Sequence, residues 1–523
     1  MWQTMNINNL LEKQGQLRSQ ELAIITANGT QTFGELLQAS QQGASFLSSL
    51  QIKKGDVILV FVPMSIELYE ILFSIWRIGA IAMFIDPAVG KNTIQKCCQK
   101  VQAKAFIGGF AGQLFRLFIP ALKRIPISIN TSSFLFGNKW SKKSKHNLIS
   151  ESKTLPILLT DPALITFTSG STGLPKVAVR THEFLISQYE VLKDTLHLMP
   201  NEINLATLPI FALVNLAAGV TTLIPNANLR KPGQVNPQPV LQQIKKLKPT
   251  TAVGSPAFFE RLLTSENCQE LQCLTHLYTG GAPVYPSLLK RLQTVMPNCN
   301  VNAVYGSTEA EPIAEFVFSH IENQIISDMQ NGKGLYAGSI IEQIECKLLN
   351  FFDYQIKPQY TQEEWENIRC KTNQPGEIVV KGKHVLSGYL NGEGDEENKI
   401  KVNGNIWHRT GDAGKFDESG HLWLLGRCSA VIRDEKGVLF PFAVEVAIKE
   451  SFPVKNVALC SFAGKRLLIV EGAADIEKNS AFQKMKSSFL IHQIIHMTIP
   501  LDKRHNAKVD YNELNNKLKQ CTI

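Results

Sequence analysis

The chain has 523 residues, which excludes a single ordinary compact core and predicts roughly two to four domains. Hydrophobic residues make up 44% and charged residues 19% of the chain, the composition of a soluble globular protein. The formal net charge is +9, and the basic residues look dispersed, with few aromatic residues near the densest cluster of lysines. We therefore expect a solvated surface with some preference for anionic ligands, and no nucleic-acid interface. The cluster comprises Lys139, Lys142, Lys143 and Lys145.

The cysteines and the apolar segments indicate the cellular compartment in which we expect the protein. The ten cysteines show no Cys-x-x-Cys spacing, and Cys97 and Cys98 are neighbours, poorly placed to bridge or chelate together. This pattern favours reduced thiols in a cytoplasmic protein. Met1–Gln16 is polar and lacks the apolar run of a signal peptide. The most apolar stretch, Ile71–Ile85, contains Arg77 and falls short of the about 20 residues that a membrane span needs, so we expect a buried helix followed by a strand.

Short apolar segments alternate with helical patterns through the N-terminal half of the chain. Asp56–Val62 and Ala80–Ile85 predict strands, and Ser65–Arg77 between them predicts a helix. Three later apolar segments, each followed by a helical pattern, are Leu164–Thr168, Asn204–Pro209 and Thr251–Val253. Strands separated by helices form mostly parallel sheets, so the pattern predicts an α/β fold with helices on both faces of its sheets.

The C-terminal half has a different pattern. Within Gly376–Gly426, short predicted strands are joined by turns that contain glycine: Glu377–Lys381, Trp407–Arg409 and His421–Leu425. This stretch predicts a smaller β-rich subdomain. A small mixed domain is expected after Arg427, with a helix rich in Lys and Asn at its end. Residues 136–154 are rich in Ser, Lys and Asn and predict an exposed loop.

A loop rich in hydroxyl groups and glycine follows the strand that is predicted to end at Phe167. It reads Thr-Ser-Gly-Ser-Thr-Gly-Leu-Pro-Lys from Thr168 to Lys176, and its other hydroxyl-bearing residues are Ser169, Ser171 and Thr172. Glycines let the backbone approach an anion, while hydroxyls, free N–H groups and Lys176 can contact phosphate oxygens. The spacing differs from that of a Walker A loop. A flexible linker would need neither the strand before it nor the apolar run Val177–Val179 after it, so we predict a phosphate-binding loop.

The loop resembles the phosphate-binding signature of the adenylate-forming superfamily, which includes acyl-CoA synthetases, luciferases and peptide-synthetase adenylation domains. Further signatures follow in the family's order: Thr279–Pro283, Tyr305–Glu309, Arg409–Asp412, Gly426-Arg427 and Lys508. Two N-terminal landmarks, Thr32–Leu36 and Lys54–Val57, also match, so the resemblance covers nearly the whole chain. It implies a large adenylation domain over residues 1–427, with a β-rich subdomain at about 335–427. A small, mobile α+β domain over residues 428–523 would carry Lys508.

The resemblance implies a role for each matched residue. Attack of a carboxylate on an α-phosphate joins two anions, and Lys508 could bridge them. Glu309 could hold Mg²⁺ against the phosphates of ATP, and Asp412 could accept the ribose hydroxyls. Arg427 could reach the ribose or a phosphate, or pair with a carboxylate, and Tyr305 could stack on adenine or belong to the core.

The full set of residues implied to act in catalysis is Thr168, Glu309, His505 and Lys508, with Glu309 also the metal ligand. The residues implied to bind the nucleotide are Thr168, Ser169, Ser171, Thr172, Lys176, Gly280, Gly281, Ala282, Tyr305, Gly306, Thr308, Asp412 and Arg427.

Three departures from the family pattern narrow the expected reaction. The hinge motif continues as Cys428-Ser429, with Arg433 at a position that is usually Lys, and the turn Gly437–Pro441 is one residue shorter than usual. Because this turn helps to form the face that delivers the thiol in acyl-CoA synthetases, its alteration puts CoA transfer in doubt. Ala212 stands where acyl-CoA ligases carry His, and Asp502–Tyr511 departs from the usual final motif.

Leu208–Leu213, Tyr305–Ala314 and residues 504–508 together resemble the β-lactone synthetases of long-chain olefin biosynthesis. In that subfamily a β-hydroxy acid is adenylated, and its own hydroxyl then attacks the activated carbonyl with release of AMP. A tethered nucleophile has a high effective concentration, which favours ring closure. Two alternatives stay open: a fatty-acyl-CoA ligase or an acyl-AMP ligase that loads a carrier protein, and a nucleotide-binding module without turnover.

The expected cofactors are ATP and Mg²⁺, with CoA only if the CoA-ligase alternative holds. The expected partner is a small-molecule long-chain acid, and the resemblance is compatible with association with other lipid-biosynthesis enzymes. Phe211–Gly219 and Val253–Phe259 are apolar and suit an alkyl chain, but a buried strand–helix core has the same pattern. We interpret most of these residues as core.

Overall fold

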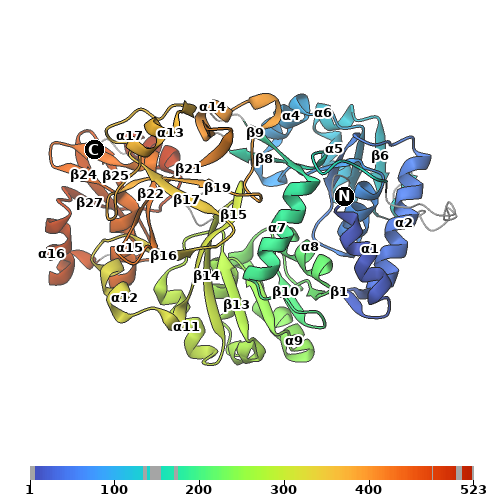
Figure 1. Cartoon of the computed structure of the whole chain (residues 1–523). Helices are drawn as coiled ribbons and strands as arrows, with labels where there is room; N and C mark the ends of the chain where they lie inside the picture. Colours follow the sequence, from blue (N-terminus) through green and yellow to red (C-terminus); the bar gives the residue numbers. More distant parts are fainter. Residues whose placement is uncertain are drawn as a thin grey trace. The chain divides into compact units, whose positions relative to one another are not determined.

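The computed structural model describes residues 6–132, 138–141, 155–169, 175–473, 475–501 and 509–520, with Ser169 described by its backbone alone. The chain divides into two units, each made of several segments. Unit 1 comprises Met1–Leu229, Gln238–Gly254 and Lys383–Glu396. Unit 2 comprises Arg230–Pro237, Ser255–Gly382 and Glu397–Ile523. Helices and strands are mixed in both units, so the predicted α/β class is confirmed (Figure 1).

Unit 1 contains a seven-stranded sheet with the order β7-β6-β5-β3-β4-β8-β9. Its strands are β3 (Val57–Phe61), β4 (Ile81–Met83), β5 (Ala105–Gly108), β6 (Ile127–Asn130), β7 (Asn138–Lys139), β8 (Pro162–Ser169) and β9 (Pro175–Thr181). All neighbours pair in parallel except β8 and β9, which are antiparallel. Parallel strands are buried on both faces, which explains their continuous apolar runs.

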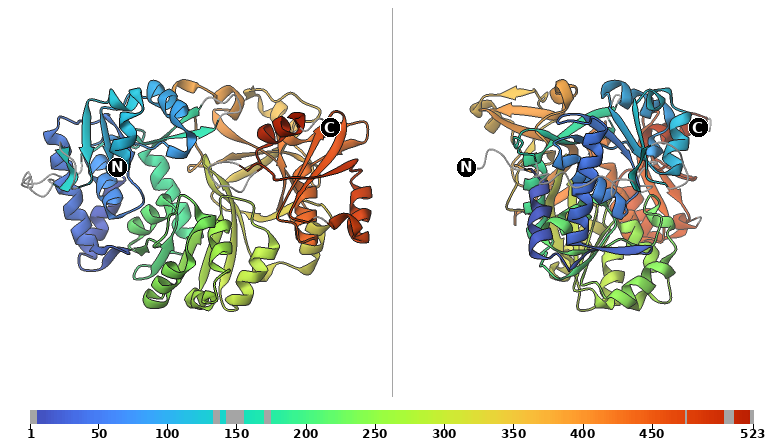
Figure 2. Two further views of the ribbon diagram at one scale, coloured as in Figure 1. Left: turned by 180° about the vertical axis from the view of Figure 1, so that it is seen from behind. Right: turned by 90° about the vertical axis from the view of Figure 1, so that its right-hand side faces the viewer.

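Helices connect these strands and cover the sheet. They are α3 (Ile66–Arg77), α4 (Lys91–Lys100), α5 (Phe110–Leu117), α6 (Pro120–Lys123) and α7 (His182–Thr195). The hydroxyl of Ser65 accepts a hydrogen bond from the Leu68 N–H and so caps the N-terminus of α3. In Figure 2 the light-blue helices α4 to α6 lie beside the blue and blue-green strands of this sheet. Leu59, Met83 and Phe106 belong to the core between them.

A second group of strands in unit 1 has the order β12-β10-β11-β1-β2. These strands are β1 (Leu22–Thr26), β2 (Gly29–Thr32), β10 (Ile203–Ala206), β11 (Thr221–Leu223) and β12 (Thr251–Gly254), and only β1 and β2 pair antiparallel. The helices of this part are α1 (Asn8–Leu17), α2 (Phe33–Ser49), α8 (Pro209–Ala218) and α9 (Pro237–Leu247). Thr32 and Glu35 form a capping box at the start of α2, which explains why the helix begins there.

In unit 2 the strands follow the order β13-β14-β15-β16-β22-β21-β19-β17, and β20 pairs with β18 and β21. They are β13 (His276–Gly280), β14 (Asn300–Ser307), β15 (Ala310–Val317), β16 (Leu335–Ile340), β17 (Glu345–Leu349), β18 (Gln359–Tyr360), β19 (Gly376–Lys381), β20 (Lys399–Val402), β21 (Asn405–Phe416) and β22 (Leu422–Arg427). The helices among them are α10 (Pro256–Leu262), α11 (Pro286–Val295), α12 (Asn323–Gln330), α13 (Gln362–Asn367) and α14 (Asp395–Asn398). β13 and β14 are parallel, whereas the strands from β14 to β17 along this order are antiparallel. This antiparallel part contains the short strands expected within Gly376–Gly426, so a β-rich subdomain is consistent with the prediction. It also includes β14 and β15, which precede the expected bounds, and those bounds stay a prediction.

The C-terminal part of unit 2 has its own small sheets and cores. The strands are β23 (Ile432–Asp434), β24 (Gly437–Leu439), β25 (Asn456–Phe462), β26 (Lys465–Glu471) and β27 (Gln493–His496), and the helices are α15 (Pro441–Ser451), α16 (Ser480–Ser488) and α17 (Tyr511–Gln520). β25, β26 and β27 form one sheet. One face packs against Val444 and Phe482, and the other packs against Leu514 and Leu518 of α17. This mixed α+β arrangement agrees with the prediction for the end of the chain.

Most predicted elements are confirmed, and one connection is corrected. The strand predicted at Leu164–Thr168 continues to Ser169 and is followed by the antiparallel strand β9, whereas we expected a helix there. The alternation of apolar residues in β9 is too short to predict a strand from sequence. The segment is a strand because it pairs with β8. The buried helix and strand expected within Ile71–Ile85 are α3 and β4. Among the described residues no helix is long and apolar enough to cross a membrane.

The exposed loop predicted at 136–154 lies mostly outside the described residues, which include only 138–141 of this range. In that part Asn138–Lys139 form β7 and Trp140 is buried, so the prediction of an exposed loop is wrong for these residues. The boundary expected between residues 427 and 428 stays a prediction. Phe211, Val253 and Phe259, from the two apolar segments that we interpret as core, are at most 7% exposed.

Candidate nucleotide-binding site

The Tyr-Gly-Ser-Thr-Glu motif lies at the end of β14 and in the turn that joins it to β15. Tyr305 is in the last part of β14, Thr308 and Glu309 form the turn, and β15 begins at Ala310. A β-carbon on Gly306 would lie 3.1 Å from the carbonyl oxygen of Ala310, so a side chain there would crowd the hairpin. Glycine thus allows the close return of the chain that places Glu309 at the tip of the hairpin.

The Thr-Gly-Gly-Ala-Pro motif ends the neighbouring strand. Gly280, the last residue of β13, pairs with Val304 of β14, and a β-carbon on Gly280 would lie 2.5 Å from the Val304 carbonyl oxygen. Gly281 has a φ of +78°, a conformation that glycine adopts without strain, and Ala282 follows it. Because β13 and β14 are parallel, their carboxyl ends meet at one edge of the sheet, where α/β proteins bind ligands. The two motifs, distant in sequence, are therefore neighbours.

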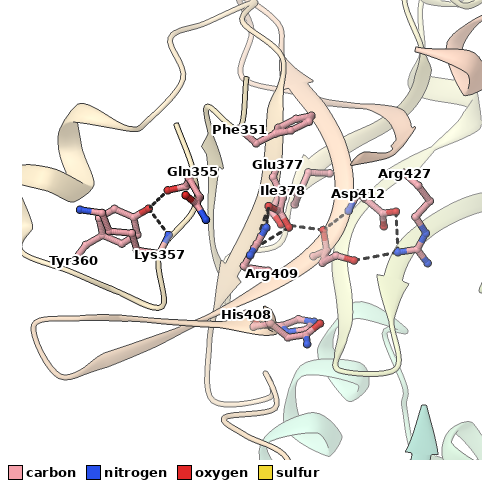
Figure 3. A network of polar contacts seen from close by, with 12 residues as sticks. Phe351, Gln355, Lys357, Tyr360, Glu377, Ile378, His408, Arg409, Asp412 and Arg427 are labelled. Atoms are coloured by element: carbon pink, nitrogen blue, oxygen red, sulfur yellow. Dashed lines mark hydrogen bonds and ion pairs between the residues drawn. The ribbon is translucent and has the colours of Figure 1, made fainter. Parts of the chain in front are cut away.

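Asp412 is held by residues from two other strands. Its Oδ2 accepts a hydrogen bond of 2.9 Å from the Tyr305 hydroxyl, and its Oδ1 lies 3.2 Å from Nη1 of Arg427. Asp412 and Arg427 are paired across β21 and β22, and both appear in Figure 3. The side chain of Asp412 is 21% exposed and that of Arg427 is 52% exposed. The carboxylate is therefore oriented by protein groups and still open to a ligand.

Thr410 supports the backbone around Asp412. Its hydroxyl donates to the Ile378 carbonyl oxygen at 2.9 Å and accepts from the Asp412 N–H at 3.1 Å. The Thr410 carbonyl oxygen in turn accepts from Nη1 of Arg427 at 3.1 Å. These bonds connect β19, β21 and the last residue of β22, so the position of Asp412 depends on three strands of the β-rich subdomain.

A buried ion pair lies beside this network. Arg409 donates to both carboxylate oxygens of Glu377, with N···O distances of 3.1, 3.1 and 2.7 Å (Figure 3). The side chain of Glu377 is only 3% exposed. Paired in this way, the two charges join β19 to β21 next to Thr410. We did not predict Glu377 as a site residue, because it lies 32 residues before Arg409 in sequence and only the strand pairing identifies it. Thr410 belongs to the matched motif Arg409–Asp412, but we assigned it no role.

The environment of the cluster keeps the Tyr305 hydroxyl protonated. Burial, and then the negative charge of Asp412, raise the pKa of Tyr305 well above its ordinary value of 10.0. Tyr305 is therefore a neutral hydrogen-bond donor to Asp412 throughout the physiological range. Burial also raises the pKa of the neighbouring Cys428 thiol, so this cysteine is not a thiolate nucleophile.

In unit 1 the predicted phosphate loop joins the two antiparallel strands β8 and β9. Thr168 and Lys176 are paired across these strands, on either side of the loop. Nζ of Lys176 lies 5.8 Å from the ring centroid of Tyr389. Residues 170–174, which include Ser171 and Thr172, lie outside the described residues, as does the side chain of Ser169. The described part therefore has the geometry of a β-hairpin, which differs from the strand-to-helix loop of a Walker A motif.

The predicted catalytic residues His505 and Lys508 also lie outside the described residues. The residues that flank them are paired, because Leu501 and Val509 form an isolated antiparallel bridge. Beyond it, the Tyr511 hydroxyl donates to Glu445 of α15 at 2.6 Å. Both ends of the segment that carries these two residues are thus attached to the C-terminal part of unit 2.

The positions that depart from the family pattern have clear structural surroundings. Ala212 lies in α8 and is fully buried, in a site where a side chain as large as His would need space. The Arg433 guanidinium lies 4.6 Å from the ring centroid of Phe352 and donates to the Phe351 carbonyl oxygen at 3.3 Å. Arg433 therefore has a structural contact that accounts for its presence at the position where Lys is usual.

No group of three or more His, Cys, Asp or Glu residues that could hold a metal ion is found in the described part of the chain. Mg²⁺ in nucleotide enzymes is held by one or two carboxylates together with phosphates and water. A single carboxylate at the tip of a hairpin, as Glu309 is, fits a Mg²⁺ ion that arrives with ATP.

The chain matches known proteins along almost its whole length. An olefin β-lactone synthetase of Xanthomonas campestris pv. campestris is 27% identical over 516 residues, which cover 93% of this chain and 90% of that protein. The corresponding enzyme of Stenotrophomonas maltophilia is also 27% identical, with the same coverage. The acyl-CoA ligase SID4 of Ajellomyces capsulatus is 26% identical and covers 90% of this chain.

Solved structures share the fold. The anthranilate CoA ligase AuaEII in complex with anthranoyl-AMP superposes with a TM-score of 0.81 at 15% identity, covering 100% of this chain and 99% of that chain. ATP-bound MatB from Rhodopseudomonas palustris has a TM-score of 0.80 at 18% identity, with 99% and 100% covered. The model of the family described as AMP-binding enzyme matches residues 11–390. The chain therefore belongs to the AMP-binding enzyme family and is an adenylate-forming enzyme.

Proposed function

We propose that this enzyme activates a long-chain β-hydroxy acid with ATP and closes the acyl-adenylate to a β-lactone. The observation that carries the first step is the Asp412 carboxylate, oriented by Tyr305 and Arg427 and still open to a ligand. The similarity to two olefin β-lactone synthetases over 93% of the chain supports the second step. The departures at Ala212 and at the hinge motif also favour a reaction that needs no CoA.

In the first step the acid's carboxylate oxygen attacks the α-phosphorus of ATP, and pyrophosphate leaves. Asp412 accepts the ribose hydroxyls, and Thr168 and Lys176, beside the phosphate loop, contact the departing phosphates. Glu309 would hold Mg²⁺, and the bound ion would supply positive charge beside the phosphates. Lys508 stabilises the negative charge that develops between the two reacting anions.

In the second step the substrate's own β-hydroxyl oxygen attacks the activated carbonyl carbon. The bond from that carbon to the phosphate oxygen breaks, and AMP leaves with the electron pair. The hydroxyl proton passes to a base, a role that we assign to His505 because a neutral imidazole accepts protons near neutral pH. The nucleophile is already attached to the substrate, which makes the attack effectively unimolecular.

The experiment compares three reactions of the full-length protein with ATP and Mg²⁺. With a long-chain 2-alkyl-3-hydroxy acid and no CoA, we expect pyrophosphate, AMP and a β-lactone. The matched acid without the 3-hydroxyl should give pyrophosphate and acyl-AMP but no lactone. A thioester that forms only when CoA is added would support the CoA-ligase alternative, and no pyrophosphate in any reaction would support a module without turnover.

We extend the proposal to the organisation of the chain. Residues 1–427 form the large adenylation domain, with its β-rich subdomain at about 335–427, and residues 428–523 form a small mobile domain that carries Lys508. The enzyme works in the cytoplasm on a small-molecule acid, in association with other enzymes of lipid biosynthesis. Limited proteolysis with and without ATP and the acid tests the boundary between the two domains, since ligands should protect the segment around residue 428.

A further inference from the structure

One part of the sequence is strongly basic. Between Asp86 and Glu151 there is no acidic residue, whereas the same stretch contains eleven lysines and arginines. They are Lys91, Lys96, Lys100, Lys104, Arg116, Lys123, Arg124, Lys139, Lys142, Lys143 and Lys145. This local charge exceeds the net charge of +9 of the whole chain, so our expectation that basic residues are dispersed is wrong for this stretch. A local charge excess of this kind indicates an anionic partner.

The helix α5 in this stretch exposes large apolar side chains on one face. Phe110 is 58% exposed, Leu114 47%, Leu117 60% and Phe118, directly after the helix, 60%. Their spacing of four, seven and eight residues places all four side chains on one side of the helix axis. We call these four residues the α5 face. A group of exposed apolar side chains on one face is unusual for a surface helix and marks a site of interaction.

The opposite side of α5 fixes the helix to unit 1. Phe115 packs against Phe61, with ring centroids 6.3 Å apart, and contacts the core of the seven-stranded sheet. The Arg116 guanidinium donates to the carbonyl oxygens of Leu122, Lys123 and Ile125 around α6. These contacts hold α5 in a fixed orientation. The α5 face is therefore exposed because the other side of the helix packs against unit 1.

Cationic side chains lie around the α5 face. Nζ of Lys91 is 5.1 Å from the ring centroid of Phe118. Val89, two residues before Lys91 in sequence, is 42% exposed. Lys123 and Arg124, at the end of α6, are exposed, and α6 packs against α5 (Figure 1). In the part of the chain that the structure describes, no ion pair joins these three cations to a carboxylate, whereas Lys100 pairs with Glu393.

We propose that the α5 face and its cationic rim bind the surface of an anionic phospholipid membrane. Phe and Leu side chains enter the boundary between headgroups and acyl chains, while Lys and Arg attract the lipid phosphates. An anionic lipid surface repels acidic side chains, so the absence of acidic residues from this stretch favours a lipid surface. A protein partner with charges of both signs would not require that absence. Binding at the membrane surface is independent of the reaction proposed above and would deliver the enzyme to water-insoluble acids.

The test is flotation of the full-length protein with phosphatidylglycerol–phosphatidylcholine vesicles and with pure phosphatidylcholine vesicles. We expect binding to the anionic vesicles that weakens at high salt, and little binding to phosphatidylcholine alone. Leu114→Ser/Leu117→Ser should abolish flotation. Lys123→Glu/Arg124→Glu should reduce partitioning by more than about 25-fold, since each cation near an anionic surface contributes about fivefold.

The matched control changes two exposed apolar residues elsewhere in unit 1, Leu17→Ser/Met199→Ser, which are 68% and 62% exposed. This control should float like the wild type, and all variants should keep their unfolding midpoints. The proposal is overturned if the wild type does not float, or if the α5-face variant floats as well as the control. It is also overturned if gel filtration shows that the α5-face variant converts an oligomer of the wild type into monomers, because the face would then bind protein.

Discussion

The hydroxyl of Tyr305 donates a hydrogen bond of 2.9 Å to Oδ2 of Asp412, across 107 residues of sequence. The bond joins the motif at the end of β14 to the motif in β21. The other carboxylate oxygen of Asp412, Oδ1, contacts Arg427. In this geometry groups of the protein itself orient Asp412. Preorganisation of this kind lowers the entropy lost on binding.

Tyr305→Phe should weaken ATP binding without unfolding the protein. A hydrogen bond to a charged group contributes about 1.5–3 kcal/mol, so KM for ATP should rise by roughly 10- to 100-fold in a pyrophosphate-release assay. Tyr336→Phe is the control, because this buried tyrosine lies in the same unit and its hydroxyl makes no side-chain hydrogen bond among the described residues. An unchanged KM together with a lower unfolding midpoint would show that the Tyr305 hydroxyl is structural.

Arg409→Met should destabilise the fold by about 3–5 kcal/mol, because it leaves the Glu377 carboxylate buried without a partner. Urea unfolding followed by tryptophan fluorescence measures the change. Arg369→Met is the matched control, since its ion pair with Glu366 is exposed and should contribute about 0–1 kcal/mol. Equal effects of the two substitutions would contradict the structural role of the buried pair.

Glu445→Gln should change how stability depends on pH. Burial raises the pKa of Glu445 to about 7. The folded state therefore holds this proton more tightly than the unfolded state, and the free energy of unfolding falls as pH rises from about 4.5 to 7. Gln can accept the same hydrogen bonds from Tyr511 and Leu459 and carries no charge.

The variant should match the wild type near pH 4.5 and exceed it at pH 7.5 by on the order of 2–3 kcal/mol. Chemical unfolding at the two pH values measures this difference. Glu435→Gln changes an exposed carboxylate and should leave the pH dependence as it is. A constant difference between Glu445→Gln and the wild type across the range would refute the prediction.

Lys508→Ala should abolish AMP transfer and leave ATP binding largely intact. Loss of one stabilising charge in a transition state typically lowers the rate by about 10²–10³-fold. ATP–pyrophosphate exchange measures the transfer, and calorimetry measures the binding. Lys519→Ala, in the exposed part of α17, should leave both unchanged. If Lys508→Ala instead lowers the unfolding midpoint, Lys508 is a structural residue.

The comparison of sequence with structure is most informative around β8 and β9. The apolar run before the phosphate loop predicts β8, but the run after it is too short to indicate whether a strand or a helix follows. Pairing of Ile165 with Val179 decides the matter, because cross-strand hydrogen bonds and packing are not local properties. The same reason explains why only three residues of β21, Trp407–Arg409, are predicted, whereas the strand continues to Phe416.

The sequence by itself determined the α/β class, the family and the motif residues of the candidate site. Hydrophobic periodicity and the order of the motifs are properties of the chain itself, so they are readable before the fold is known. Only the tertiary structure decided that Tyr305, Asp412 and Arg427 meet and that Glu377 supports them. The structure also decided that α5 exposes its apolar residues. Strand register and burial are set by contacts between segments far apart in the chain, and these contacts exist only in the folded state.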